Sequence, residues 1–140
     1  MEKTLILIKP DIIKKNRIGK IISILEENKL EINNIFMFNF KDEEAKIFYK
    51  DHQTKPFFNE LISFIKSDKI VAIILSGENI INKVRKLIGD TNYKKAENNT
   101  IRSMFATSLT ENAVHASDSI ESSKREINII LNIIKMYEYK

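Results

Sequence analysis

The sequence of 140 residues contains no cysteine, which excludes disulfides and any zinc site built on cysteine. The first apolar stretch runs only from Leu5 to Ile8, whereas a membrane-spanning helix needs ~20 apolar residues. A secretory signal also needs a longer apolar region than this one. We therefore expect a cytoplasmic protein that has no membrane partner.

Glycine is scarce as well, with three residues in the whole chain, at positions 19, 77 and 89. A phosphate-binding P-loop and a dinucleotide-binding fingerprint both need closely spaced glycines, so neither motif is present. If the chain binds a nucleotide, side chains must hold the phosphates in place of a glycine-lined loop.

The chain does contain enough apolar material for a core, because 43% of its residues are hydrophobic and 30% are charged. Its length is typical of one domain, which we expect to span residues 1–140. The formal net charge of +4 favours anionic partners such as nucleotides. Because 19 lysines stand against only 4 arginines, each retained arginine is a candidate for a bidentate contact.

Apolar periodicity predicts alternating strands and helices. We expect strands at residues 3–8, 32–40 and 70–75, and helices at 18–28, 42–49, 78–88, 119–130 and from Pro56 onward. Gly89 should end the helix before it, and Asp118 with Glu121 should cap the last helix. A polar loop at 90–99 and a further strand near 112–118 complete an α+β order close to βαββαβ. This order predicts a ferredoxin-like fold, a four-stranded antiparallel sheet covered by helices.

Side chains able to bind phosphate occur at the ends of these elements. Lys9 follows the first strand, and Arg85 lies in the helix before the long loop. Thr91 opens that loop and Arg102 follows it. Each of these residues alone is typical of a solvated surface side chain, so only their combination indicates a site.

His115, one of the chain's two histidines, lies in N-A-V-H-A-S-D-S at residues 112–119. Taken alone, it is a candidate nucleophile, a metal ligand or an ordinary polar residue of a loop. A histidine that accepts phosphate needs one ring nitrogen free and the other held by an acceptor. Glu126 is a candidate acceptor in the following helix, although a carboxylate there is also typical of a helix surface. His52, in the polar run D-H-Q, is interpreted as a solvated surface residue.

Together these segments resemble the nucleoside diphosphate kinase family. The resemblance rests on I-K-P-D at 8–11, F-Y at 48–49, K-P-F-F at 55–58, V-R-K-L-I-G-D-T-N at 84–92, T-I-R at 100–102, the histidine motif, E-S at 121–122 and R-E at 125–126. It extends over nearly all of residues 3–127. It implies the ferredoxin-like fold and Mg²⁺-dependent transfer of the terminal phosphate from a nucleoside triphosphate to a nucleoside diphosphate. The transfer would be ping-pong, through a phosphohistidine, with broad base and sugar specificity.

The resemblance also implies a role for each matching residue. His115 would be the nucleophile, Glu126 would bind its other ring nitrogen, and Ser117 would support that arrangement. Lys9, which also counts among the catalytic residues, would surround the phosphates together with Tyr49, Arg85, Thr91 and Arg102. Asn112 would reach the ribose, and Phe57 and Leu109 would pack on the two sides of the base. The resemblance implies no metal ligand from the protein, since the phosphates would carry Mg²⁺, and it implies a homo-oligomer, either a tetramer or a hexamer.

The chain departs from the family's pattern at several positions. Ala116 replaces a glycine, and Ser103 and Met104 replace the Gly-Asp of I-R-G-D-F. Asn98 and Asn99 replace a Pro-Gly pair in the long loop, and the isoleucine-rich end at 127–140 lacks the usual aromatic pair. Alanine would be strained at position 116 if φ were positive there, but we expect its small side chain to be tolerated.

Two other hypotheses remain open on the sequence alone. One is a catalytically weak nucleotide- or nucleic-acid-binding protein of the same fold, which the basic charge slightly favours. The lysines are scattered, without a basic stripe and interleaved aromatics, so nucleic acid is not expected as the main ligand. The other is a structural or interaction domain, which the coincidence of so many matching polar positions opposes.

Overall fold

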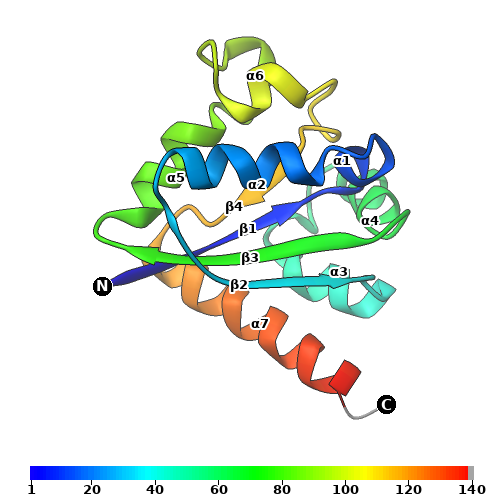
Figure 1. Ribbon diagram of the computed structural model, residues 1–140. Coiled ribbons are helices and arrows are strands. Elements are labelled where there is room, and N and C mark those ends of the chain that lie inside the picture. The colour runs from blue at the N-terminus through cyan, green and yellow to red at the C-terminus, as the bar shows by residue number, and fades with distance from the viewer. Residues whose placement is uncertain (139–140) are drawn as a thin grey trace.

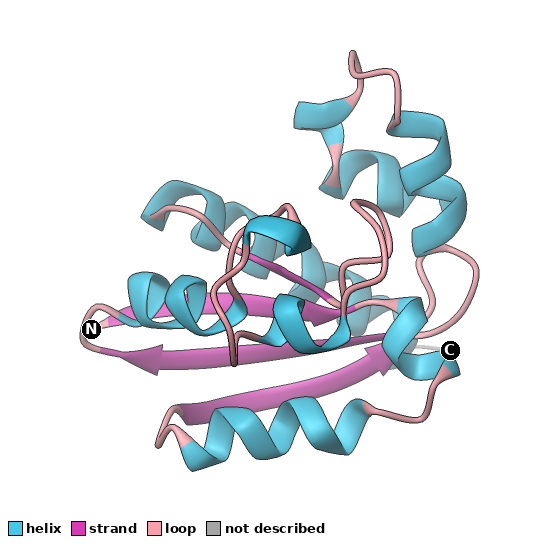
Figure 2. Cartoon of the chain, turned by 90° about the horizontal axis from the view of Figure 1, so that it is seen from above, coloured by secondary structure: helices cyan, strands magenta, loops and turns pink. Residues whose placement is uncertain are grey.

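The computed structural model describes residues 1–138. Its elements are, in order, β1 (Glu2–Ile8), α1 (Pro10–Lys14), α2 (Ile18–Glu27), β2 (Glu31–Phe38), α3 (Asp42–Phe48), α4 (Phe58–Ile65), β3 (Ile70–Gly77), α5 (Ile80–Ile88), α6 (Ile101–Phe105), β4 (Val114–Ala116) and α7 (Ile120–Glu138). Short 3₁₀ turns occur at η1 (Lys50–His52) and η2 (Tyr93–Lys95). Helices make up most of the chain outside the sheet (Figure 2).

The four strands form one antiparallel sheet in the order β2-β3-β1-β4. This arrangement confirms the predicted ferredoxin-like fold (Figure 1). The short strand β4 pairs with the other side of β1, where His115 lies opposite Leu7. His115 is therefore held by a strand at one edge of the sheet, beside a buried central strand.

Helices cover both faces of the sheet, with α2 and α5 on one face and α3 and α7 on the other (Figure 1). Successive side chains of β1 point to opposite faces, so Ile6 and Ile8 pack under α2 and α5, while Leu5 and Leu7 pack against the other layer. All four are completely buried. This double coverage explains why the strand is a continuous apolar run without polar alternation.

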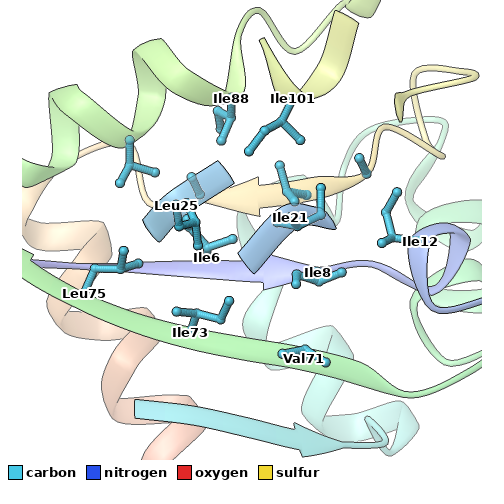
Figure 3. Packing of buried hydrophobic residues seen from close by; sticks show 14 of the residues in the cluster. Ile6, Ile8, Ile12, Ile21, Leu25, Val71, Ile73, Leu75, Ile88 and Ile101 are labelled. Atoms are coloured by element: carbon cyan, nitrogen blue, oxygen red, sulfur yellow. The ribbon is translucent and has the colours of Figure 1, made fainter. Parts of the chain in front are cut away.

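The core beneath α2 and α5 is built from branched aliphatic side chains. Ile21 and Leu25 are four residues apart in α2, so they share the helix face that points to the sheet (Figure 3). They pack in one cluster with Ile6, Ile8 and Ile73 of the strands. Burying each such side chain contributes ~1.5–3 kcal/mol, so this cluster fixes the central strand that carries Lys9 at its end.

Some elements differ from the prediction. The short helices α1 and α6 have five residues each, too few for an apolar period to reveal them. Helix α4 begins at Phe58, with Pro56 in the preceding turn. Helix α7 extends well beyond the predicted end at residue 130, because the apolar face continues through its isoleucine-rich part. The last two residues of that segment lie outside the described residues.

The predicted cap of α7 by Asp118 is wrong. The hydroxyl of Ser119 accepts the backbone N–H of Ser122 at 3.0 Å, so the first turn is capped one residue later than expected. The Asp118 side chain instead lines the cleft described below.

Candidate active site

A cleft of about 610 Å³ opens beside β4. It brings together every residue that the sequence predicted to meet the nucleotide, together with the candidate nucleophile: Lys9, Tyr49, Phe57, Arg85, Thr91, Arg102, Leu109, Asn112 and His115. These residues come from distant parts of the chain and meet only because the sheet and its covering helices assemble around them. The two remaining predicted residues, Ser117 and Glu126, contact each other and lie behind His115.

The imidazole of His115 is held by a buried carboxylate. Its Nε2 lies 2.9 Å from Oε1 of Glu126, and the Ser117 hydroxyl donates to the same oxygen at 2.7 Å. A carboxylate group accepts hydrogen bonds, so this contact favours the tautomer whose ring proton is on Nε2. The other ring nitrogen, Nδ1, then has a free lone pair, as a nucleophile requires.

Two aromatic rings of the α3 end fix the orientation of the imidazole. The rings of Phe48 and Tyr49 contact His115 edge to face, with centroids 5.2 and 5.8 Å from that of the imidazole. Within residues 1–138, the buried Tyr49 hydroxyl has no hydrogen-bond partner. Burial raises the pKa of Tyr49, so the phenol keeps its proton and can donate to a ligand in the cleft.

Three cations converge on the cleft. Lys9 is only 6% exposed, and its Nζ donates to Oδ1 of Asn112 at 2.7 Å. Burial, together with repulsion from Arg102, lowers the pKa of Lys9 to about 7. Burial and the nearby Arg85 likewise lower the pKa of Arg102 to about 10. Such depressed pKa values mean that positive charge is under-compensated here, so an anion of several charges would relieve the repulsion.

The two arginines are also tied to the backbone around the nucleophile. Arg85 donates to the carbonyl of Ala116 at 3.2 Å, one residue after His115. Arg102 donates to the carbonyl of Val114 at 2.9 Å, one residue before it, and to that of Gly89 at 3.1 Å. The guanidinium groups are thereby held on either side of the His115 backbone.

Gly89 ends α5, as predicted, and its backbone could not carry a side chain. Its φ is +89°, and a Cβ atom would lie 2.5 Å from Oγ1 of Thr100. Its carbonyl also accepts from Arg102. Glycine here therefore lets α5 and the Arg102 segment approach closely.

The unusual residues of the long loop have local explanations. Asn99 adopts a positive φ of 71°, a conformation that asparagine tolerates better than most residues. The hydroxyl of Ser103 donates to the carbonyl of Thr100 at 2.8 Å, while Thr100 itself caps α6. Met104 is 49% exposed, and nothing in the structure explains why it stands there.

Ala116 is tolerated, as expected, because it lies in the extended backbone of strand β4 and is not among the described residues with a positive φ. The strained alanine is Ala113, whose φ is +74°. The positive φ is therefore at Ala113, three residues before Ala116, where the sequence analysis had considered it.

The mouth of the cleft is apolar. Phe57 and Leu109 both line it and are 41% and 63% exposed. The ammonium group of Lys55 lies 5.6 Å from the centre of the Phe57 ring. Exposed apolar side chains in a cleft fit a flat aromatic ligand such as a base, and stacking does not distinguish one base from another.

The interpretation of His52 as a solvated surface residue is wrong. His52 lines the cleft, with ring centroids 6.1 Å from Tyr49 and 5.8 Å from Phe57. Its Nδ1 is buried and has no hydrogen-bond partner in the described part of the chain. Burial, and then the charge of Lys55, lower the pKa of His52. The available signal was its spacing of three residues from Tyr49, which places both rings on one side of a helical turn.

The cleft has further lining residues that the sequence did not predict to meet the nucleotide: Glu60, Leu61, Ser108, Thr110, Ala116 and Asp118. A hydrogen bond from the Ser122 hydroxyl lowers the pKa of Asp118, so this carboxyl group is ionised at neutral pH. Across residues 1–138, no group of three or more His, Cys, Asp or Glu side chains could hold a metal ion.

Comparisons with known proteins agree over nearly the full length. A family model described as nucleoside diphosphate kinase matches residues 2–135. The nucleoside diphosphate kinase of Clostridium perfringens is 50% identical over 129 residues, which cover 92% of this chain and 90% of that protein. The crystal structure of the Aquifex aeolicus nucleoside diphosphate kinase superposes with a TM-score of 0.89 at 42% identity, covering 92% of this chain and 94% of that one. The halophilic nucleoside diphosphate kinase of Halobacterium salinarum, solved in complex with CDP, superposes with a TM-score of 0.88 at 33% identity, covering 91% and 86%.

Proposed function

The chain belongs to the nucleoside diphosphate kinase family, and we propose that it transfers phosphate through His115. The protein is a nucleoside diphosphate kinase, a phosphotransferase that acts on nucleotides. The observation that carries the assignment of the nucleophile is the contact of 2.9 Å between Nε2 of His115 and a buried carboxylate. That contact leaves Nδ1 of a half-buried imidazole as the free nucleophile in a cationic cleft.

The proposed transfer has two matching steps. The Nδ1 lone pair of His115 forms a bond to the terminal phosphorus of a nucleoside triphosphate, and the bond from that phosphorus to the bridging oxygen breaks. The nucleoside diphosphate leaves with the electron pair. A terminal phosphate oxygen of a second nucleoside diphosphate then attacks the phosphohistidine, and the electron pair returns to Nδ1. The Nε2 proton stays on the ring throughout, where Glu126 stabilises the positive charge of the phosphorylated imidazole.

The cations supply the charge that phosphoryl transfer needs. Catalysis of this reaction rests mainly on in-line positioning and on neutralising charge that spreads over the transferred oxygens. We assign Lys9, Arg85 and Arg102 to this neutralisation, with the hydroxyls of Tyr49 and Thr91 as neutral donors. These groups are held in place before substrate binds, so little reorganisation is needed when the charge develops.

The remainder of the nucleotide is assigned to neutral parts of the cleft. Asn112 is assigned to the ribose, and Phe57 and Leu109 to the two faces of the base. Stacking on Phe57 does not distinguish one base from another, so we propose broad specificity for base and sugar. The cytidine diphosphate named with the Halobacterium salinarum structure is in keeping with a pyrimidine in such a cleft.

We propose that Mg²⁺ is the divalent cation and that the nucleotide phosphates bind it. Mg²⁺ keeps several waters and commonly joins proteins through substrate phosphates, which suits a cleft whose strongest groups are cations. When bound, it would neutralise phosphate charge and orient the phosphate oxygens. Asp118 is the carboxylate of the cleft best suited to accept hydrogen bonds from that water shell, since its pKa is lowered.

We propose a homo-oligomer, either a tetramer or a hexamer, that uses the outer edge of β2. This strand is at one end of the sheet order, so its outer backbone groups are available for pairing. Ile35 and Met37 point to the same face of β2 and are 48% and 51% exposed. Exposed apolar side chains on a sheet edge are typical of a surface that a second copy covers.

We also propose that the protein works in the cytoplasm, which cell fractionation would test. None of the helices described over residues 1–138 is long and apolar enough to span a membrane.

The first experiment is incubation with γ-labelled ATP and Mg²⁺, without an acceptor. We expect acid-labile, alkali-stable label on the wild type, no label on His115→Ala, and discharge of the label by GDP or CDP. Lys124→Ala is the matched control, because this residue is exposed on α7 close to Glu126 and does not line the cleft. A wild type that binds ATP but takes up no label would overturn the assignment of His115 and support a weakly active binding protein.

A further inference from the structure

The acidic residue of the I-K-P-D motif, Asp11, has no part in the chemistry above. Asp11 is 2% exposed and does not line the cleft. Its Oδ2 accepts the backbone N–H of Ala113 at 3.0 Å, whereas its Oδ1 has no hydrogen-bond partner among residues 1–138. A buried, half-partnered carboxyl group is unfavourable unless the contact that it makes is needed.

The partner of Asp11 is a strained turn. Ala113 has a φ of +74°, and the N–H of Val114 donates to the carbonyl of Asn112 at 2.9 Å across it. A hydrogen bond between residues two apart, around a residue with this φ, is a γ-turn of the rare and strained kind. The methyl group of alanine makes such a φ unfavourable, so surrounding contacts must hold it.

Those contacts come from both sides of the peptide. The N–H of Ala113 is bound by the Asp11 carboxylate, and its carbonyl accepts the backbone N–H of Lys9 at 2.9 Å. Ala113 is completely buried, so water cannot replace either partner without entering the core. We propose that Asp11 is a positioning residue for phosphoryl transfer, whose carboxylate holds the strained turn at Ala113 and thereby sets the places of Asn112 and His115 in the cleft.

The turn stands between groups assigned to the substrate, so this inference rests on the proposed function. Asn112, immediately before it, accepts from Nζ of Lys9 and donates to the carbonyl of Thr91 at 3.3 Å. Val114, immediately after it, binds Arg102 and leads into His115. If the turn relaxed to a negative φ, Asn112 and the start of β4 would both shift. A misplacement of ~1 Å in a catalytic site can cost roughly 100-fold in rate.

The test is a double-mutant cycle between positions 11 and 113. Asp11→Ala removes the acceptor, and we expect it to slow single-turnover labelling of His115 by roughly 10- to 100-fold. Ala113→Gly lets the turn keep its positive φ without help, so we expect that variant to label like the wild type. In the double variant Asp11→Ala/Ala113→Gly, labelling should recover to within about threefold of Ala113→Gly, because the strain that Asp11 offset is gone.

Asp11→Asn is the conservative variant, because its amide oxygen can still accept the N–H of Ala113. We expect it to label at close to the wild-type rate and to fold even if Asp11→Ala does not. Asp11→Ala and Asp11→Asn remove the same negative charge beside Lys9, so any change in the protonation of that lysine is common to the two variants and does not enter their comparison. Thermal unfolding of each variant is measured in parallel, so that only folded protein enters the comparison.

The outcomes separate the two proposals. A wild type that takes up no label contradicts the proposed nucleophile itself. If the wild type is labelled, then full-rate labelling of Asp11→Ala overturns the positioning role, as does a double variant as slow as Asp11→Ala. An Asp11→Asn variant as slow as Asp11→Ala would also overturn it, because the negative charge and not the held turn would then be what matters.

Discussion

His52 lines the cleft between the rings of Tyr49 and Phe57, and its buried Nδ1 has no hydrogen-bond partner among the described residues. Its lowered pKa keeps the imidazole neutral at pH 7, so one nitrogen donates and the other accepts. We expect it to hydrogen-bond the nucleotide between the base and the transferred phosphate.

His52→Leu should therefore raise KM for nucleoside diphosphates by roughly 10-fold, the value of one hydrogen bond to a charged group, with a smaller effect on kcat. His52→Gln, which keeps a donor and an acceptor, is the matched control and should lie nearer the wild type. Steady-state kinetics with ADP and CDP as acceptors measures both. An unchanged KM in His52→Leu would mean that the ring only fills space.

The lowered pKa of Lys9 predicts that nucleotide binding is linked to proton uptake. Its pKa of about 7 in the free protein means that, at about pH 8, most molecules carry a neutral amine at this position. A bound phosphate group favours the ammonium form and raises this pKa. Nucleotide binding at that pH should therefore take up as much as one proton, and affinity should fall as pH rises above 7.

Calorimetric titration of ADP in buffers of different ionisation enthalpy would measure the uptake directly. Lys9→Arg is the control, because a guanidinium group keeps its charge throughout this range and should abolish most of the uptake. Wild-type binding at about pH 8 with no change in protonation would contradict the assignment of Lys9 to the phosphates.

At the scale of elements, α7 is joined to the end of α3 by an arginine next to the carboxylate that binds the nucleophile. Arg125 donates to the carbonyl of Ile47 at 2.6 Å and to that of Phe48 at 3.3 Å. These carbonyls belong to the last turn of α3, where a cation is favourable. This contact between α7 and α3 lies next to the nucleophile. Glu126 on α7 and Phe48 on α3 both contact His115.

Arg125→Met keeps the length of the side chain but removes its donors, so the two elements can shift relative to each other. We expect labelling of His115 at saturating ATP to slow by roughly 3- to 10-fold, with KM changed less. Arg125→Lys should recover part of the rate, since it keeps one donor group. Lys124→Met, at the exposed neighbouring position, controls for the loss of a charge on α7. Equal slowing in both methionine variants would assign the effect to charge alone.

Elements with a clear apolar period were predictable, and those set by tertiary contact were not. The run at 70–75 and the periodic segment at 18–28 appear as β3 and α2 because burial of their own side chains dictates them. The helices α1 and α6 are too short to show a period. The strand predicted near 112–118 is confirmed as β4, but its length of three residues is set by its pairing with β1. For the same reason the site residues could be assembled only through the family resemblance, while His52 and Asp11 owe their importance to neighbours distant in sequence.

At the scale of the whole molecule, the two edges of the sheet have different functions. The β4 edge is short and carries the nucleophile, with the cleft beside it. The β2 edge is longer and exposes apolar side chains on one of its faces. An exposed sheet edge that is also apolar promotes association with another chain. A second copy of the same chain is the partner we expect, because most oligomers of soluble proteins are built from identical subunits.

The proposed assembly through β2 is tested by placing charge on that edge. Ile35→Lys combined with Met37→Lys should lower the molar mass in solution to that of a smaller species, because lysine on an edge strand opposes pairing and is costly to bury. Sedimentation velocity or light scattering after gel filtration gives the mass. Ile120→Lys is the matched control, since Ile120 is 54% exposed at the start of α7, just after β4 at the other end of the sheet order, and this variant should assemble like the wild type. A monomeric wild type, or an unchanged mass in the double variant, would exclude this edge as the contact between subunits.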